Sequence, residues 1–198
     1  MKHMEYLKTN MFPLFWCKGC GNGVVLGAIT RAFEQLGMTR ENTVVVTGIG
    51  CWGKVDDYVT TNAFHGTHGR ALAFATGIKL ANPSLDVVVL MGDGDGATIG
   101  GNHFIHACRR NIDVTAIMVN NYNYGMTGGQ YSGTTPEGAT TTTSRYGHIE
   151  QPFDICELAK AAGAPFVARS AADDPVGLRV GESAGKVLEQ GSGEGRRA

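Results

Sequence analysis

The chain contains no long apolar run: no segment reaches the roughly 20 consecutive apolar residues that a membrane-spanning helix requires. Charge is scarce as well. Charged residues make up 18% of the sequence and the formal net charge is −1, which gives no reason to expect nucleic acid or a membrane surface as a partner. The polar residues 1–5 are not followed by the apolar core of a signal peptide, so we expect a cytoplasmic protein.

Cysteine occurs in an odd number, five, which argues against a framework of paired disulfides. Glycine, by contrast, is abundant, with 29 positions, and apolar residues make up 42% of the chain. A chain of 198 residues with this apolar content can bury one substantial core. We therefore expect one α/β domain whose sheet is covered on both faces.

Apolar, β-branched runs alternate with segments of helical periodicity. The runs predict strands at residues 43–47, 86–91, 114–119 and 165–168, and the periodic segments predict helices at residues 24–36, 68–80, 100–110 and 154–162. This alternation predicts an α/β fold with a doubly wound, mostly parallel sheet. We assign residues 1–172 to one domain and expect residues 173–198 to be an atypical, poorly ordered tail of a chain that looks shortened at its C-terminus.

Polar residues follow two successive predicted strands, at the point where each strand ends. Gly92-Asp93-Gly94 follows the second strand, and Asn120-Asn121 follows the third, about 25 residues later. Because parallel strands joined by a helix end at the same edge of a sheet, we expect Asp93 and Asn121 to lie side by side. Together with a backbone carbonyl near Asn123, their oxygens suit a Mg²⁺ ion that holds a diphosphate. The alternative is a pair of unrelated turns.

The segment 125–151 has no periodicity and is rich in Gly and Thr. It is too long for an idle connection, and long ordered loops beside a binding edge usually fold over a ligand. We therefore expect it to cover the site; the alternative is a flexible surface loop.

Three of the cysteines form a second candidate site. Cys17-Lys18-Gly19-Cys20 places two thiols on one tight turn, and Cys51 follows the first predicted strand, at the same edge as Asp93. Three converging thiolates suit Zn²⁺ or an iron–sulfur cluster. A thioredoxin-type pair and three cysteines without any ligand are the alternatives. We interpret Cys108 and Cys156, which lie in helical patterns, as packing residues.

Six short stretches form a specific combination of motifs. They are Trp16-Cys17-Lys18-Gly19-Cys20-Gly21, Gly48-Ile49-Gly50-Cys51, His68-Gly69-Arg70-Ala71, Gly92-Asp93-Gly94-Asp95, Ile99-Gly100-Gly101-Asn102-His103 and Tyr124-Gly125-Met126-Thr127-Gly128-Gly129-Gln130. Over roughly residues 10–170 this combination resembles the β subunit of the two-subunit 2-oxoacid:ferredoxin oxidoreductases. The resemblance implies a thiamine diphosphate-binding fold that holds thiamine diphosphate, Mg²⁺ and one [4Fe–4S] cluster.

The resemblance also implies an activity and partners. The expected reaction is oxidative decarboxylation of a 2-oxoacid to acyl-CoA and CO₂, with electrons passed through the cluster to ferredoxin. The expected partners are a larger α subunit, which would supply the glutamate that activates the cofactor, and ferredoxin, with coenzyme A and the 2-oxoacid as substrates. This chain alone would then be inactive.

By the same resemblance, Cys17, Cys20 and Cys51 would be three of the four cluster ligands, and the fourth Cys ligand is not identifiable in this chain. Asp93, Asn121 and Asn123 would hold Mg²⁺. The residues that the resemblance assigns to cofactor binding are Gly50, Cys51, His68, Gly92, Asp93, Gly94, Asp95, Asn121, Tyr124, Gly125, Met126 and Thr127.

Two residues are candidates for a direct part in catalysis. Lys54 lies just beyond Cys51, where its cation could pair with a substrate carboxylate, and this favours a dicarboxylic 2-oxoacid such as 2-oxoglutarate. His68, like His65, could hydrogen-bond to cofactor or substrate. A solvated loop lysine and a histidine satisfied by backbone are the alternatives.

Two other functions compete with this interpretation. A non-oxidative thiamine diphosphate-dependent decarboxylase or synthase subunit would keep the Asp93 and Asn121 site but would not need the three cysteines. A non-catalytic zinc-stabilised α/β module would use the cysteines alone to bind a partner.

Overall fold

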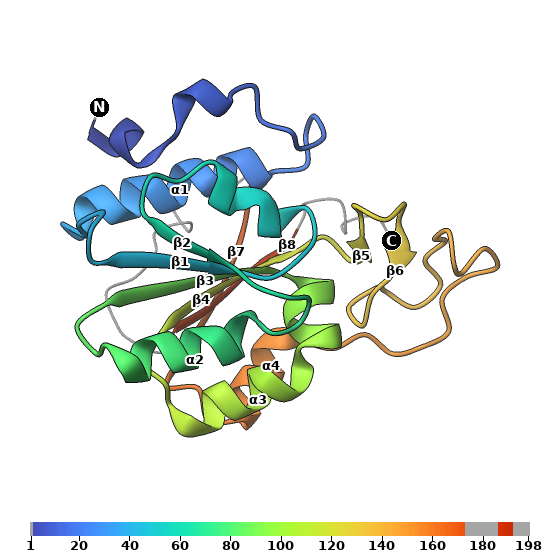
Figure 1. Cartoon of the computed structure of the whole chain (residues 1–198). Helices are drawn as coiled ribbons and strands as arrows, with labels where there is room; N and C mark the ends of the chain where they lie inside the picture. Colours follow the sequence, from blue (N-terminus) through green and yellow to red (C-terminus); the bar gives the residue numbers. More distant parts are fainter. Residues whose placement is uncertain (1, 173–185, 192–198) are drawn as a thin grey trace.

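The computed structural model describes residues 2–172 and 186–191, which are organised around a six-stranded parallel sheet (Figure 1). The strands are β1 (Thr43–Thr47), β2 (Asn62–His65), β3 (Asp86–Gly92), β4 (Thr115–Asn120), β7 (Phe166–Ala171) and β8 (Lys186–Gly191). Their order across the sheet is β2-β1-β3-β4-β8-β7, and each neighbouring pair is parallel. The predicted α/β fold with a doubly wound sheet is confirmed.

Helices cover both faces of this sheet. α1 (Asn22–Gln35) lies on one face, and α2 (Ala71–Ala81), α3 (Gly101–Arg110) and α4 (Ile155–Ala161) lie on the other, as Figure 1 shows. Alternate strand residues point to opposite faces, so Val45 and Leu90 pack with Phe33 of α1, whereas Val46 packs with Phe104 of α3. Within the described residues, no helix is long and apolar enough to cross a membrane.

Short elements complete the described chain. The tight helical turns are η1 (Lys2–Tyr6), η2 (Thr9–Met11), η3 (Trp52–Asp57) and the π-helical η4 (Gly94–Ile99), and β5 (Asn123–Tyr124) pairs antiparallel with β6 (Gln130–Tyr131). The helix ends follow local chemistry. Asn111 is left-handed after α3, with φ of 50°, and the Asp154 carboxylate accepts a hydrogen bond from the Glu157 N–H at 3.0 Å at the start of α4.

Two strands of the six-stranded sheet, and the short β5 and β6, were missing from the sequence prediction. β2 is an edge strand in which all four residues are exposed, so it has no apolar run to reveal it. β8 pairs with β4 and β7 in the region where we expected an irregular tail, and its register sets Leu188 beside Ile117. Only Val187 and Leu188 are apolar in it, so no apolar run predicts this strand. The rest of the expected tail, 173–185 and 192–198, lies outside the described residues.

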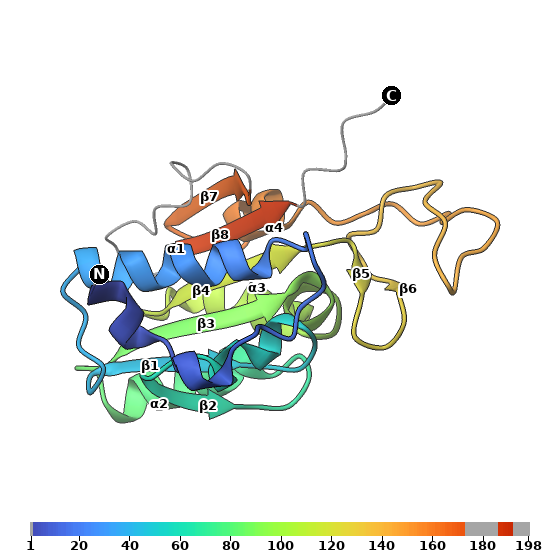
Figure 2. The ribbon, with the colours of Figure 1, turned by 90° about the horizontal axis from the view of Figure 1, so that it is seen from above.

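The loops at the carboxyl edge of the sheet position the candidate site. In Figure 2 the segment from β5 onward extends beyond the ends of β3 and β4. Part of this segment packs inward, because Ser132, Thr134 and Thr135 are all at most 2% exposed. The first part of the loop that we predicted to cover the site is therefore packed against the protein. Further along the same loop, Tyr146 and Ile149 are exposed.

Candidate functional site

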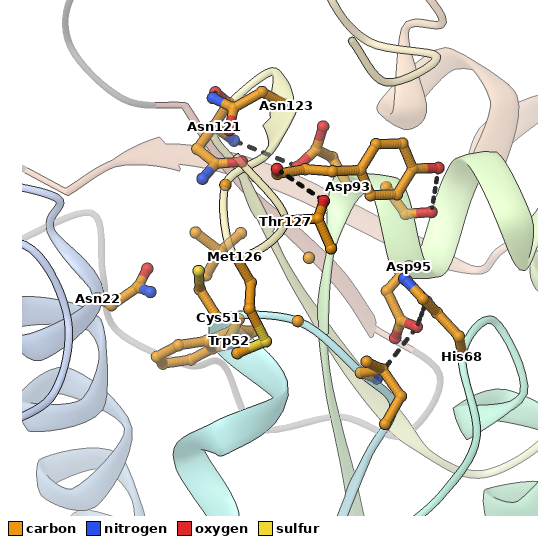
Figure 3. Close-up of a pocket in the computed structure, with 17 residues that line it drawn as sticks. Asn22, Cys51, Trp52, His68, Asp93, Asp95, Asn121, Asn123, Met126 and Thr127 are labelled. Carbon is orange, nitrogen blue, oxygen red and sulfur yellow. Dashed lines mark hydrogen bonds and ion pairs between the residues drawn. The ribbon is translucent and has the colours of Figure 1, made fainter. Parts of the chain in front are cut away.

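A pocket opens at the carboxyl edge of the sheet, beyond the ends of β1, β3 and β4 (Figure 3). Its volume is about 580 Å³, counted out to open solvent. The lining residues are Asn22, Ile49, Gly50, Cys51, Trp52, His68, Gly92, Asp93, Gly94, Asp95, Val119, Asn121, Asn123, Tyr124, Gly125, Met126 and Thr127. Every residue that we predicted to bind the cofactor is among them, and so is Asn123. The structure thus gathers these residues at one place, while their binding role stays a prediction.

Asp93 is one of two buried carboxylates of the pocket, with 1% of its surface exposed. Its Oδ2 accepts hydrogen bonds from the hydroxyls of Ser132 and Thr134, both at 2.6 Å. Burial raises the pKa of the Asp93 carboxyl, although these two hydroxyls and the Asn121 N–H act in the opposite direction. Because the hydroxyls fix Oδ2, the other oxygen is left for the pocket.

Three oxygens meet beside Asp93: its Oδ1, the side-chain oxygen of Asn121 and the backbone carbonyl of Asn123. The Asn121 oxygen lies 3.0 Å from each of the other two, and turning the amide over would place its nitrogen there as a donor to both. The turned amide satisfies both acceptors without a cation, whereas with the oxygen inward three acceptors face one another, and only a cation between them would stabilise that arrangement. Adjacent oxygens of an octahedral Mg²⁺ ion, bound at 2.0–2.1 Å, are about 2.9 Å apart. The donor set therefore fits Mg²⁺.

The turn that carries these oxygens is strained and anchored. Tyr122 has φ of 64°, a left-handed conformation that is unusual for a bulky residue. Its N–H donates to the Asn120 side chain at 3.2 Å, and its carbonyl accepts from the Thr135 hydroxyl at 2.5 Å. The turn thereby directs Asn123 back toward Asp93. Sequence reasoning missed Ser132, Thr134 and Thr135, and the signal available was their position in the aperiodic loop.

Asp95 does not face a metal position but holds His68. Its Oδ1 accepts hydrogen bonds from the N–H groups of Gly69 at 2.7 Å and Ile49 at 3.3 Å, and lies 2.5 Å from His68 Nδ1. The carboxylate is 3% exposed and packs so close to Gly48 that a Cβ there would lie 2.1 Å from Oδ2. This arrangement leaves Nε2 as the nitrogen that His68 can offer to the pocket.

Gly94 allows Tyr124 to pack across the pocket wall. A Cβ at Gly94 would lie 2.3 Å from the Tyr124 ring, whose hydroxyl donates to the Gly94 carbonyl at 3.2 Å. Burial raises the pKa of the Tyr124 phenol, and the neighbouring Asp93 and Asp95 carboxylates raise it further. The phenol therefore stays protonated and acts as a hydrogen-bond donor at neutral pH.

The cysteines approach one another without forming a closed set of ligands. Cys17 and Cys20 are exposed, and Cys51 is half-buried in the pocket wall. Burial raises the pKa of the Cys51 thiol, and the nearby Cys17 and Cys20 thiols raise it further, so the three lie within electrostatic range. The Trp16 indole donates to the Cys51 carbonyl at 2.5 Å, which ties the N-terminal turn to this edge. In the part of the chain that is described, however, no three His, Cys, Asp or Glu residues group closely enough to hold a metal ion.

These surroundings predict an order of thiol reactivity. Burial raises the pKa of Cys108 to about 11, and its side chain packs from α3 into the hydrophobic core. At pH 8 its thiolate fraction is then on the order of 0.1%, whereas Cys17 and Cys20 are exposed. Iodoacetamide followed by mass spectrometry should label Cys17 and Cys20 well before Cys108. Equally fast labelling of Cys108 would contradict the packing described here.

Lys54 lies outside the pocket lining. Its ammonium pairs with Asp57 at 2.5 Å, and this hydrogen bond raises the pKa of Lys54. His65 also lies outside the lining, with Nδ1 3.0 Å from Asp56. The structure adds four pocket residues that the sequence had not singled out as ligands: Asn22, Ile49, Trp52 and Val119.

Comparison with known proteins agrees with the geometry. Residues 42–180 match the family of thiamine pyrophosphate enzymes described as the C-terminal TPP binding domain. The chain is 61% identical over 174 residues to the 2-oxoglutarate synthase subunit KorB of Archaeoglobus fulgidus, covering 88% of this chain and 65% of that protein. It is 48% identical over 163 residues to the 2-oxoglutarate oxidoreductase subunit KorB of Mycobacterium tuberculosis, covering 82% of this chain and 44% of the relative.

A solved structure is also similar. It is 2-oxoglutarate:ferredoxin oxidoreductase from Magnetococcus marinus with 2-oxoglutarate, coenzyme A and succinyl-CoA bound, and it matches with a TM-score of 0.88 and 36% identity. The match covers 96% of this chain and 67% of that one. The chain thus spans about two thirds or less of the length of these relatives. It belongs to the thiamine pyrophosphate enzymes and, within them, is related to the β subunits of 2-oxoacid:ferredoxin oxidoreductases.

Proposed function

We propose that this chain acts as the β subunit of a cytoplasmic 2-oxoacid:ferredoxin oxidoreductase. With an α subunit it would convert a 2-oxoacid, with 2-oxoglutarate favoured, to acyl-CoA and CO₂, and electrons would pass through an iron–sulfur cluster to ferredoxin. The observation that carries the proposal is the position of the Asn121 side chain, which lies 3.0 Å from both Asp93 Oδ1 and the Asn123 carbonyl at the edge of a parallel sheet. The names of the relatives and the ligands of the Magnetococcus marinus enzyme support the choice of substrate.

Several pocket residues have a definite part in this proposal. Asp93, Asn121 and the Asn123 carbonyl hold Mg²⁺, which in turn binds the diphosphate of the cofactor. Thiamine diphosphate, when bound, supplies the electron-sink chemistry by which a 2-oxoacid loses CO₂. Met126 and the neighbouring turn line the wall and limit access of water, and His68 Nε2, oriented by Asp95, accepts or donates a proton at that nitrogen.

The cluster is the part of the proposal that the described residues fit least well. Cys17, Cys20 and Cys51 are the proposed ligands, but the turn at 17–20 must close toward Cys51, and a fourth ligand must come from elsewhere. The three thiols remain the proposed ligands of the cluster. Lys54 remains the proposed partner of a substrate carboxylate, and it would first have to leave Asp57.

The composition of the chain purified without oxygen tests the proposal. We expect bound thiamine diphosphate and Mg²⁺ at a ratio near one, together with iron and acid-labile sulfide. Thiamine diphosphate without iron would favour the non-oxidative decarboxylase or synthase subunit, because that enzyme needs none of the three cysteines. Zinc without thiamine diphosphate would reject both thiamine-dependent functions in favour of the zinc-stabilised binding module.

A matched variant separates the two thiamine-dependent functions. Replacing Cys17 and Cys20 together by serine should abolish ferredoxin reduction in the enzyme assembled with its α subunit, while the chain keeps its thiamine diphosphate, because neither residue lines the pocket. A variant with unchanged ferredoxin reduction would rule out a role of these thiols in electron transfer.

A further inference from the structure

Asn22 is a buried polar residue whose side chain has no assigned role. It begins α1, only 5% of it is exposed, and in the described part of the chain its amide makes no hydrogen bond. The N-cap of α1 is Gly21, so Asn22 lies one residue beyond the position from which a side chain caps the helix. Here the amide instead lines the pocket, and Figure 3 shows it directed from α1 toward the space beside Cys51 and Met126.

The backbone around Asn22 carries positive potential. α1 is 14 residues long, and the residue before it, Gly21, has no side chain that could cap it. The first bond of the helix runs from the Val25 N–H to the Gly21 carbonyl at 3.0 Å, so the preceding N–H groups have no carbonyl within the helix. Such a helix start attracts anions through these N–H groups and through the helix dipole.

The charges of the pocket determine which groups can hold an anion there. Among the described residues that line the pocket, none is Lys or Arg, whereas Asp93 and Asp95 are both carboxylates. A divalent cation would balance these two carboxylates and leave little charge to offset an anionic ligand. A diphosphate or a 2-oxoacid must therefore be held largely by neutral donors and by the helix dipole.

We propose that the Asn22 amide and the amino end of α1 form an anion-binding position in the pocket wall. It lies across the pocket from His68 and Asp95, as Figure 3 shows. Its ligand is a group of anionic oxygens, either the carboxylate of the 2-oxoacid or the diphosphate of the cofactor. The proposal rests on the function proposed above and adds a residue that neither the family match nor the names of the relatives assign.

The test is the substitution Asn22→Asp in the full chain. It keeps the shape of the side chain but places a negative charge where the anion binds, so ligand affinity should fall about 10- to 100-fold. An acidic residue in the first turn of a helix is favourable, so the thermal unfolding midpoint should not fall. The matched control is Asn102→Asp, the same change in the first turn of α3 at an exposed position outside the pocket.

Isothermal titration with Mg²⁺–thiamine diphosphate, with 2-oxoglutarate and with inorganic pyrophosphate separates the outcomes. Weaker binding of thiamine diphosphate and pyrophosphate assigns the position to the diphosphate, and weaker binding of 2-oxoglutarate alone assigns it to the substrate carboxylate. Unchanged affinities for all three overturn the proposal. If the unmodified chain binds no thiamine diphosphate, the proposed function fails, and the binding of pyrophosphate alone decides about the anion position. In that case, pyrophosphate binding that is weaker in Asn22→Asp than in the unmodified chain supports the anion position. Any other result rejects it.

Discussion

The substitution Asp93→Asn is expected to weaken binding of Mg²⁺–thiamine diphosphate by about 100-fold or more, because it removes the one charged member of the oxygen set. The fold should not suffer. Burial raises the pKa of Asp93, so stability falls as the pH rises from the ordinary pKa of the carboxyl to the raised one and the cost is complete above it, and a neutral amide removes this cost. The unfolding free energy without Mg²⁺ should therefore stay within about 1 kcal/mol of the unmodified chain.

Titration calorimetry and denaturant unfolding measure the two effects separately. Ser132→Ala leaves Asp93 charged but removes one of its hydroxyl donors, so it should cost only about tenfold in affinity. Asp86→Asn is the control, since Asp86 is exposed at the opposite end of the same strand. If Asp93→Asn still binds the cofactor as tightly as the control does, the oxygen set is not the metal site.

The sequence predicted the position of Asp93 and Asn121 because topology alone determines it. Two buried strands joined by one helix must run parallel and end at the same edge, so residues that follow them become neighbours. The register of β3 and β4, with Gly92 opposite Val119, brings this about. The hydroxyls that hold Asp93 could not be predicted in this way. They come from a loop without periodicity, whose path depends on its own contacts.

Other differences have similar causes. The sequence prediction for Lys54 rested on its distance from Cys51 along the chain, but η3 turns the side chain toward Asp57. The helix predicted at residues 24–36 begins two residues earlier in the structure, at Asn22, and the direction of that side chain depends on how α1 crosses the sheet. β2 lacks an apolar run because it lies at the edge and its residues are exposed. Local patterns thus predict elements and their ends, whereas side-chain direction depends on packing.

The substitution Gly48→Ala is expected to lower the free energy of unfolding by about 3 kcal/mol, at the upper end of the cost of overpacking. A Cβ at this position would lie 2.1 Å from Asp95 Oδ2 and 2.6 Å from Asp95 Oδ1. Asp95 cannot easily retreat, because its Oδ1 is fixed by the Gly69 and Ile49 N–H groups and lies against His68. Accommodating the methyl group therefore breaks these contacts as well.

Denaturant unfolding of three further variants isolates this cause. Gly77→Ala is the matched control, since Gly77 is exposed in α2 with nothing within 4 Å of a Cβ, and there the change should stabilise the helix by roughly 0.5–1 kcal/mol. Asp95→Ala and the double variant with Gly48→Ala complete a double-mutant cycle. If the clash is the cause, the added methyl group should cost much less once Asp95 is gone. A Gly48→Ala chain as stable as Gly77→Ala would mean that Asp95 is mobile and does not hold His68 in a fixed orientation.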